Sequence, residues 1–216
     1  MPSPAQDSLN IIYQDDKLLA VSKPAEVLSV PGKTETDCME ARVQATFPTA
    51  RICHRLDMST SGLLLFALDP KTHRNIGLQF EKRKIQKVYI ARIWGEPSAK
   101  EGFIDLPLRC DWPNRPRQMV DHKEGRSAQT HWRIIAREAD DKGNAITRVE
   151  LKPITGRSHQ LRVHMLELGH PILGDNLYAH EQALAASPRL HLHAQALSLH
   201  HPDDGRIITL EDPCPF

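Results

Sequence analysis

The sequence predicts an α+β fold with a largely antiparallel or mixed β-sheet core flanked by helices. Segments that alternate apolar and polar residues outnumber segments with helical periodicity. These strand-like segments follow one another in runs, without a regular strand–helix–strand alternation. The chain also lacks a Gly-rich phosphate loop, so the pattern argues against a dinucleotide-binding or P-loop enzyme.

The first elements are two short strands and a helix. LNIIYQDDKLLAVSK predicts two strands around the turn 14–16, ending at Lys23-Pro24. Residues 37–47 predict a helix, with Asp37 as its N-cap.

A buried strand and an exposed helix follow. The almost wholly apolar run 63–68 predicts a strand. PKTHRNIGLQFEKRK, residues 70–84, predicts a helix that begins with Pro70 in its first turn. QKVYIARIWG, residues 86–95, alternates like a strand.

The second half of the chain contains one predicted helix among strands. SHQLRVHMLELG, residues 158–169, has apolar residues at i, i+4 and i+7 from Leu161. Ser158 can cap this helix and Gly169 can end it. Strands are predicted at 128–137, 145–153, 191–200 and 206–210.

Length and composition indicate one globular domain, which we expect over residues 9–216 after a short tail, residues 1–8. No apolar run approaches the ~20 residues that span a bilayer, and the N-terminus lacks signal-peptide features. The four scattered cysteines predict free thiols in a reducing compartment. We therefore expect a cytoplasmic protein.

Positive charge is concentrated in part of the chain, although the net charge is only +1. Residues 71–92 contain seven Lys or Arg and a single acid, Glu81. A second basic cluster comprises Arg109, Arg115 and Arg117. This asymmetry suits a protein with a phosphate-facing side, although from charge alone a solvated helix face is the simpler interpretation.

Three segments contain candidate site residues. Asp57 follows Arg55 on a polar turn before the apolar run, and Tyr89 lies on a predicted strand. GRSHQLRVH places Arg157 just before a helix N-terminus and Arg162 one turn inside it. If that turn faces Asp57, Arg162 keeps the carboxylate ionised. Taken singly, Asp57 is better explained as a turn carboxylate that bonds its own backbone, and Arg162 as a member of a surface ion pair.

Two other kinds of site fit the sequence less well. His191 and His193 would share one strand face, but no carboxylate or thiol lies at a supporting spacing for a metal. Ser61 lies in T-S-G rather than in the G-x-S-x-G of a hydrolase nucleophile. We expect no metal site and no serine hydrolase.

The motif H-R-L-D-x-x-T-S-G, residues 54–62, resembles the catalytic motif of the RluA family of pseudouridine synthases. Lys23-Pro24 upstream, Tyr89 after a basic segment, and GRSHQLRVH and GHPILGD downstream match the family in order. The resemblance covers nearly the whole chain. DWPNRP and LKPITGRSHQLRVHM resemble a member that acts on both ribosomal and transfer RNA.

The resemblance implies a pseudouridine synthase fold with a catalytic cleft across the sheet. It implies an isomerase that converts uridines in stem-loops of 23S rRNA and tRNA, including the anticodon arm. The reaction needs no cofactor, because no atom is gained or lost. The family's larger members carry an N-terminal S4-type RNA-binding domain, which we do not expect here, and we expect a monomer without membrane contacts.

The resemblance also assigns roles to residues. Asp57 is the essential carboxylate, and the sequence leaves open whether it attacks C1′ or takes a proton from C2′. Arg162 is its partner, while Tyr89 lines the pocket, stacks on uracil and can help remove the C5 proton. Residues expected to contact RNA or to replace the flipped base are Arg55, His54, Arg157 and His159.

Two other functions stay open from the sequence. A non-catalytic RNA-binding module is one, although the intact set Asp57, Tyr89 and Arg162 argues against it. A nucleic-acid glycosylase is the other, and it would release free base. A glycoside hydrolase needs two carboxylates at the bond, whereas the sequence offers one strong candidate.

Overall fold

The computed structural model describes residues 9–216, so the expected tail at 1–8 lies outside the described residues. Its first half contains β1 (Ile11–Gln14), β2 (Leu18–Lys23), α1 (Met39–Thr46), β3 (Arg51–Ile52), β4 (Ser61–Ala67), α2 (Pro70–Glu81), β5 (Gln86–Trp94) and β6 (Glu101–Asp105). Its second half contains β7 (Leu108–Cys110), η1 (Trp112–Asn114), β8 (Gln118–Val120), β9 (Gln129–Ala139), β10 (Ala145–Pro153), α3 (Gln160–Glu167), α4 (Glu181–Ala185), β11 (Leu192–His200) and β12 (Ile207–Glu211).

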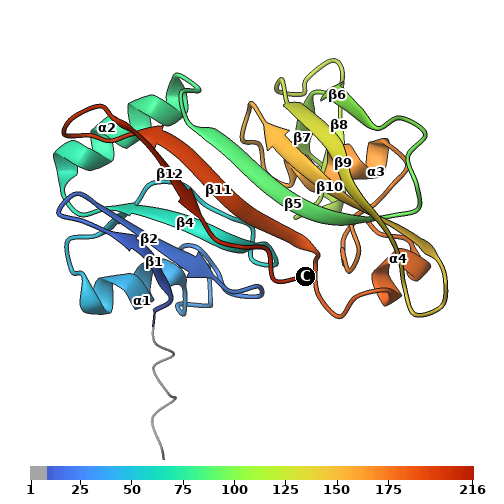
Figure 1. Ribbon diagram of the computed structural model, residues 1–216, viewed down its shortest axis with the longest axis horizontal. Helices are drawn as coiled ribbons and strands as arrows, with labels where there is room; N and C mark the ends of the chain where they lie inside the picture. Colours follow the sequence, from blue (N-terminus) through green and yellow to red (C-terminus); the bar gives the residue numbers. More distant parts are fainter. Residues whose placement is uncertain (1–8) are drawn as a thin grey trace, which may run out of the picture.

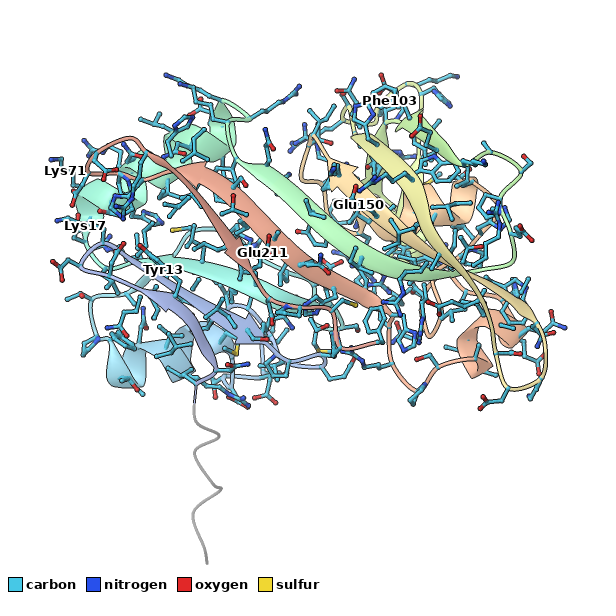
Figure 2. All side chains as sticks on the ribbon, viewed as in Figure 1. Tyr13, Lys17, Lys71, Phe103, Glu150 and Glu211 are labelled. Atoms are coloured by element: carbon cyan, nitrogen blue, oxygen red, sulfur yellow. The ribbon has the colours of Figure 1, made fainter. Side chains whose placement is uncertain are left out.

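Ten strands form one continuous sheet in the order β1-β2-β4-β11-β5-β10-β9-β6, with β12 beside β11 and β3 beside β4. β7 and β8 form a separate hairpin. The pairs are antiparallel except β4–β11, which confirms the predicted α+β fold. Tyr13 on β1 and Phe103 on β6 mark the two outer strands, on opposite sides of the molecule (Figure 2).

The strands β11 and β5 cross the middle of the molecule and join its two halves (Figure 1). α1 and α2 flank the half that contains β1, β2 and β4, whereas α3 and α4 lie in the half with β9 and β10. None of the helices in residues 9–216 is both long and apolar enough to cross a bilayer.

The strand β4 is buried along its whole length because a helix covers each of its faces. Leu63 and Leu65 pack in a cluster with Ile76 of α2. Leu64 and Phe66 point the other way and pack in a cluster with Val43 of α1. Burial on both faces explains why the sequence is continuously apolar here rather than alternating.

The ends of the helices differ in part from the predictions. Pro70 lies in the first turn of α2 as predicted, but the helix stops at Glu81. The prediction that Asp37 is the N-cap of α1 is wrong. Cys38 is the N-cap, and its Sγ accepts a hydrogen bond from Ala41 N, while Asp37 binds the Arg42 guanidinium.

The start of α3 also differs. Ser158 is not the N-cap, since His159 occupies that position in a left-handed conformation with φ 52°. Gly169, with φ 88°, follows the last turn as predicted. The sequence did not predict the short elements β3, β6, β7, β8 and α4.

Gly62 makes the parallel contact between β4 and β11 possible. It pairs with Ala194, has φ 114°, and a Cβ at this position would lie 2.4 Å from Ala194 O. We expect Gly62→Ala to lower the free energy of unfolding by about 2–4 kcal/mol, because the added atom meets backbone and the conformation is strained.

Urea denaturation measures this change, and Gly77→Ala is the matched control. Gly77 lies on the exposed face of α2 with open space around it, so alanine there is expected to stabilise by about 0.5–1 kcal/mol. Equal stability of the two variants would contradict the role assigned to Gly62.

Candidate active site

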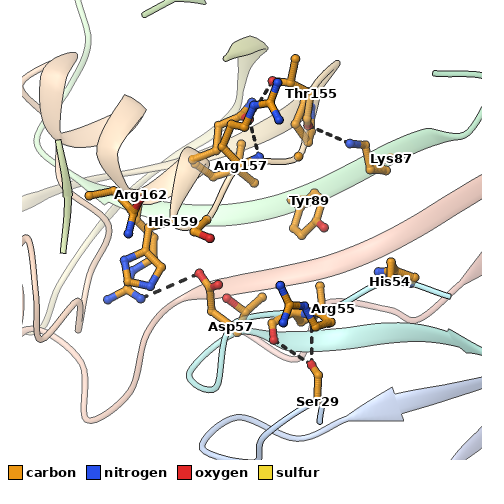
Figure 3. Close-up of a pocket in the computed structure, with 18 of the residues that line it drawn as sticks. Ser29, His54, Arg55, Asp57, Lys87, Tyr89, Thr155, Arg157, His159 and Arg162 are labelled. Carbon is orange, nitrogen blue, oxygen red and sulfur yellow. Dashed lines mark hydrogen bonds and ion pairs between the residues drawn. The ribbon is translucent and has the colours of Figure 1, made fainter. Parts of the chain in front are cut away.

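A cleft of about 960 Å³ opens between the two halves of the sheet, and Figure 3 shows its walls. The loop that precedes β4, the strand β5 and the segment that leads into α3 form these walls. All seven residues singled out in the sequence line it: His54, Arg55, Asp57, Tyr89, Arg157, His159 and Arg162. Residues more than 100 positions apart are thus brought together in one cleft.

The loop that presents Asp57 is fixed by hydrogen bonds through its backbone. Ser29 Oγ donates to Leu56 O at 2.7 Å and accepts from Leu56 N at 3.0 Å. Lys23 Nζ donates to Met58 O at 2.8 Å. The residues on both sides of Asp57 are therefore held while its side chain, 30 % exposed, faces the cleft.

Lys23 is fully buried beneath this loop. Its ammonium donates to three carbonyl oxygens, those of Pro24, Val27 and Met58. Burial lowers the pKa of Lys23 to about 8, although nearby carboxylates, Asp57 among them, act in the opposite direction. Three acceptors match the three protons of an ammonium group, so Lys23 holds the loop in its charged form at neutral pH.

Arg162 lies between two carboxylates. Its Nη1 is 3.9 Å from Asp57 Oδ2, which confirms that the turn faces Asp57. Its stronger partner is Asp175, to which Nε and Nη2 donate at 2.8 and 2.6 Å. Arg162 is therefore shared between the two carboxylates, and Asp175 orients the side chain first.

The pair formed by Arg162 and Asp175 is almost completely buried, with side chains 4 % and 0 % exposed. Burial lowers the pKa of Arg162, but the hydrogen bonds and charge of Asp175, with the charge of Asp57, outweigh it and the pKa is raised. Asp175 also accepts hydrogen bonds from the backbone N–H groups of Leu177 and Tyr178. A fixed guanidinium thus presents one edge to Asp57.

Tyr89 projects from β5 into the cleft (Figure 3). Burial raises the pKa of its hydroxyl, and the negative charge of Asp57 raises it further. The phenol therefore keeps its proton at neutral pH, so the ring can stack on a base or donate a hydrogen bond.

His54 and Arg55 occupy different environments although they are adjacent. His54 Nε2 accepts from Leu65 N at 3.1 Å, and its ring packs against Phe80 at 5.3 Å. Burial lowers the pKa of His54 to about 4, so this imidazole is neutral and tied to the framework. Arg55 is exposed on the cleft wall, where a ligand can reach it.

Arg157 and His159 lie on the opposite wall. Arg157 Nε donates to Ser127 O at 3.1 Å, which anchors the side chain near the α3 N-terminus. Burial lowers the pKa of His159, while the charge of Asp57 acts to raise it. His159 is therefore neutral at pH 7.

The charge that lines the cleft is mainly positive. Its acids are Asp57 and Glu81, and its cations are Arg55, Arg83, Lys87, Arg115, Arg157 and Arg162. Lys87 Nζ donates to Thr155 O at 2.8 Å, and burial followed by the charge of Arg83 lowers its pKa to about 8. An excess of cations around one central carboxylate suits a polyanion bound across the cleft.

No group of three or more His, Cys, Asp or Glu in the part of the chain that the structure describes could hold a metal ion. His193 is instead bonded to Ser61 Oγ at 2.9 Å through Nδ1 and to Asp212 O at 2.9 Å through Nε2. The four cysteines are free thiols, as predicted.

Comparison with known proteins decides the family. The family model for RNA pseudouridylate synthase matches residues 17–167. The dual-specificity RNA pseudouridine synthase RluA of Salmonella typhi is 49% identical over 99% of this chain and 96% of its own. The RluA protein of Yersinia pestis is 54% identical over 90% of this chain and 94% of its own. The chain belongs to the RNA pseudouridine synthase family.

Solved structures of this family show the same fold. Human RNA Pseudouridylate Synthase Domain Containing 1 superposes with a TM-score of 0.84 at 29% identity, covering 100% of this chain and 87% of that one. Human RNA Pseudouridylate Synthase Domain Containing 4 gives 0.76 at 25% identity, covering 95% and 88%. The resemblance inferred from H-R-L-D-x-x-T-S-G is confirmed.

Three residues in and around the cleft could not be given a role from the sequence. Asp175 lies in the GHPILGD segment, but only the fold shows that it binds Arg162. Lys23 belongs to the Lys23-Pro24 motif, but the sequence does not show that its ammonium holds the Asp57 loop. Tyr178 was not singled out, although its ring lies 5.1 Å from the Arg162 guanidinium. A buried arginine needs a carboxylate partner, and this rule could have indicated that a residue such as Asp175 binds Arg162.

We expect Asp175→Asn to lower the free energy of unfolding by about 3–5 kcal/mol, because it removes one charge of a buried pair. Turnover should fall as well, since Arg162 is no longer held against Asp57. Urea denaturation and an activity assay measure the two effects. Asp37→Asn is the matched control, because the Asp37–Arg42 pair is solvent-exposed. Equal losses in both variants would contradict the role given to Asp175.

Proposed function

We propose that the protein isomerises specific uridines to pseudouridine in stem-loops of 23S rRNA and of tRNA, including the anticodon arm. The observation that carries the proposal is one carboxylate, Asp57, held against a buried guanidinium in a cation-lined cleft. Family membership and about 50% identity to relatives named as dual-specificity enzymes support the choice of substrates.

The reaction conserves every atom of the nucleotide. The N1–C1′ bond breaks, the uracil turns, and a C5–C1′ bond forms, while C5 loses a proton and N1 gains one. Asp57 serves this sequence as an ionised carboxylate, whether it acts on C1′ or on the C2′ proton. Arg162 stabilises that charge, and Asp175 keeps the guanidinium in place.

Tyr89 supports the base rather than removing a proton as a phenolate, because the pKa of its hydroxyl is raised. Its ring lies on the cleft wall beside Asp57, where it can stack on a uracil taken out of the RNA. Arg55 is exposed near the same loop and is placed to fill the space that the flipped base leaves.

The hairpin of β7 and β8 extends the RNA-facing surface beyond the cleft. Trp112 at its tip is 63 % exposed, and the Arg115 guanidinium lies 4.5 Å from the centre of its ring. Arg115 also lines the cleft. An exposed aromatic ring under a cation is suited to stack on an unpaired base, which is available in a loop and not in a duplex.

We expect Asp57→Asn to abolish pseudouridine formation, with at least about a 10³-fold loss of rate, because an amide neither attacks C1′ nor accepts a proton. RNA affinity should change little, since phosphate contacts come from the cations. Tritium release from C5-labelled uridine measures turnover, and a filter assay measures binding. Asp16→Asn is the matched control, because Asp16 is exposed in the turn between β1 and β2 and does not line the cleft.

Three outcomes of this experiment would each contradict the proposed function in a different way. Appreciable turnover by Asp57→Asn would contradict the assignment. Release of free uracil by the wild-type protein would indicate a glycosylase, and binding without any turnover would indicate a silent RNA-binding module.

We expect a stem-loop of about 15–20 nucleotides to be modified, whether it has the sequence of an anticodon arm or of a 23S rRNA hairpin. A base is easiest to extrude from a loop, and closing the loop into a continuous duplex should abolish modification. Affinity should fall about 10²-fold between about 50 and 200 mM salt, as expected for about four phosphate contacts. Modification of assembled ribosomal subunits alone would contradict the dual-substrate proposal.

A further inference from the structure

Tyr178 contacts residues from several parts of the site. It is 5 % exposed and lies in the segment after α3. Its ring lies 5.1 Å from the guanidinium of Arg162 and 5.4 Å from that of Arg117. Its hydroxyl accepts from the backbone N–H of Gln118, on β8, at 2.7 Å.

The same hydroxyl lies 2.7 Å from His159 Nδ1. A phenol has one proton, and burial raises the pKa of Tyr178 to about 12, so that proton is retained. Gln118 already donates to the oxygen. If His159 Nδ1 also carried a proton, two N–H groups would point at the oxygen and the buried O–H would lack an acceptor among the described residues. Every group is satisfied only when Tyr178 donates to Nδ1.

We propose that Tyr178 is a positioning residue that holds His159 in the tautomer with its proton on Nε2, so that His159 donates a hydrogen bond to an oxygen of the RNA bound in the cleft. A neutral imidazole carries one ring proton, and an acceptor at Nδ1 leaves it on Nε2. His159 lines the cleft beside Arg162, so Nε2–H is the donor left for a ligand.

The backbone of His159 fits this role. Its φ of 52° places it in the left-handed region at the start of α3, and its side chain makes no capping bond. Helix N-caps ordinarily bind a backbone N–H of the first turn. Here the side chain is bonded to Tyr178 instead, so position 159 contributes its imidazole to the cleft wall rather than to the helix end.

Tyr178 thereby links the β7–β8 hairpin to the catalytic centre. The bond from Gln118 N ties the hairpin to the hydroxyl, and the ring lies against the guanidinium that faces Asp57. The oxygen that His159 contacts belongs either to a phosphate or to the uracil ring, both of which are acceptors at neutral pH.

The first test uses the free protein and is independent of the proposed function on which the inference otherwise rests. Histidine labelled with ¹⁵N reports which ring nitrogen carries the proton, and the signal missing from His159→Gln assigns His159. We expect a protonated Nε2 and a bare Nδ1 at about pH 7. A proton on Nδ1 in the wild-type protein would overturn the proposal whatever the enzyme's activity.

The second test is Tyr178→Phe. The signal of His159 should change from one tautomer to a mixture, and kcat/KM on a stem-loop should fall about tenfold, the value of one hydrogen bond. Tyr13→Phe is the matched control. It removes a hydroxyl of the outer strand β1, whose partner is Asp15 and which does not line the cleft. An unchanged tautomer in Tyr178→Phe would overturn the proposal even if activity fell.

The third test distinguishes the role of His159 as a hydrogen-bond donor from its contribution to stability. The amide nitrogen of glutamine reaches the position of Nε2, whereas that of asparagine reaches the position of Nδ1. Asparagine tolerates the left-handed backbone better, so His159→Asn should melt at the higher temperature. We expect His159→Gln nevertheless to keep the higher kcat/KM. The reverse order of activity would show a structural role alone and overturn the proposal.

The substrate identifies the acceptor. Two modified stem-loops each replace one acceptor oxygen. One carries a methylphosphonate beside the target nucleotide, and the other has thiouracil as the target base. The loss caused by His159→Asn should vanish with the substrate that lacks its acceptor. Full loss with both substrates would contradict a contact with either oxygen.

Discussion

The geometry of the candidate active site depends on the burial of one guanidinium. Arg162 is 4 % exposed, and such a charge is tolerated only with carboxylate partners. Asp175 satisfies two of its N–H groups in bidentate geometry, which fixes the plane of the guanidinium. Asp57 then meets an edge that is already in place, at 3.9 Å, and stays partly exposed to the cleft. The close pair of Arg162 with Asp175 is thus structural, whereas the longer contact of Arg162 with Asp57 leaves Asp57 available to a ligand.

The sheet brings the two sides of this arrangement together. Asp57 precedes β4, and Arg162 lies on α3, which follows β10. β11 and β5 lie between β4 and β10 in the sheet, and the parallel pairing of β4 with β11 depends on a glycine at position 62. Lys23 and Ser29 hold the Asp57 loop from the N-terminal half. The site is therefore assembled from both halves of the molecule.

Local patterns in the sequence predicted the long elements well. β10 covers 145–153 as predicted, and the apolar run before α2 is the doubly covered strand β4. The short strands β3, β6, β7 and β8 and the helix α4 were not predicted, because two to five residues carry too little periodicity to detect. The N-caps were wrong because Cys38 and His159 took the positions expected for Asp37 and Ser158, and a cap depends on backbone angles that residue type alone does not determine.

The sequence predicted which residues belong to the candidate site, but it did not predict all the contacts between them. The motif 54–62 and the segment 156–164 indicated Asp57 and Arg162, and the structure brings these residues into contact. The sequence could not show that Arg162 is shared, because Asp175 is 13 positions away along the chain and reaches the guanidinium only through the turn after α3. Tertiary contacts of this kind leave no periodic signal.

Burial also keeps several titratable side chains of the cleft uncharged. It lowers the pKa values of His54 and His159 and raises that of Tyr89, so all three side chains are neutral near pH 7. They can stack, donate or accept, but they do not add charge beside Asp57. The ion pair of Arg162 and Asp175 lies closest to that carboxylate on the α3 side. Of the other cations that line the cleft, Arg55, Arg83 and Arg115 are exposed, where a phosphate backbone can reach them. A base that leaves the RNA stack would thus meet one carboxylate, one guanidinium and neutral side chains, a setting suited to breaking and remaking a bond at the same carbon.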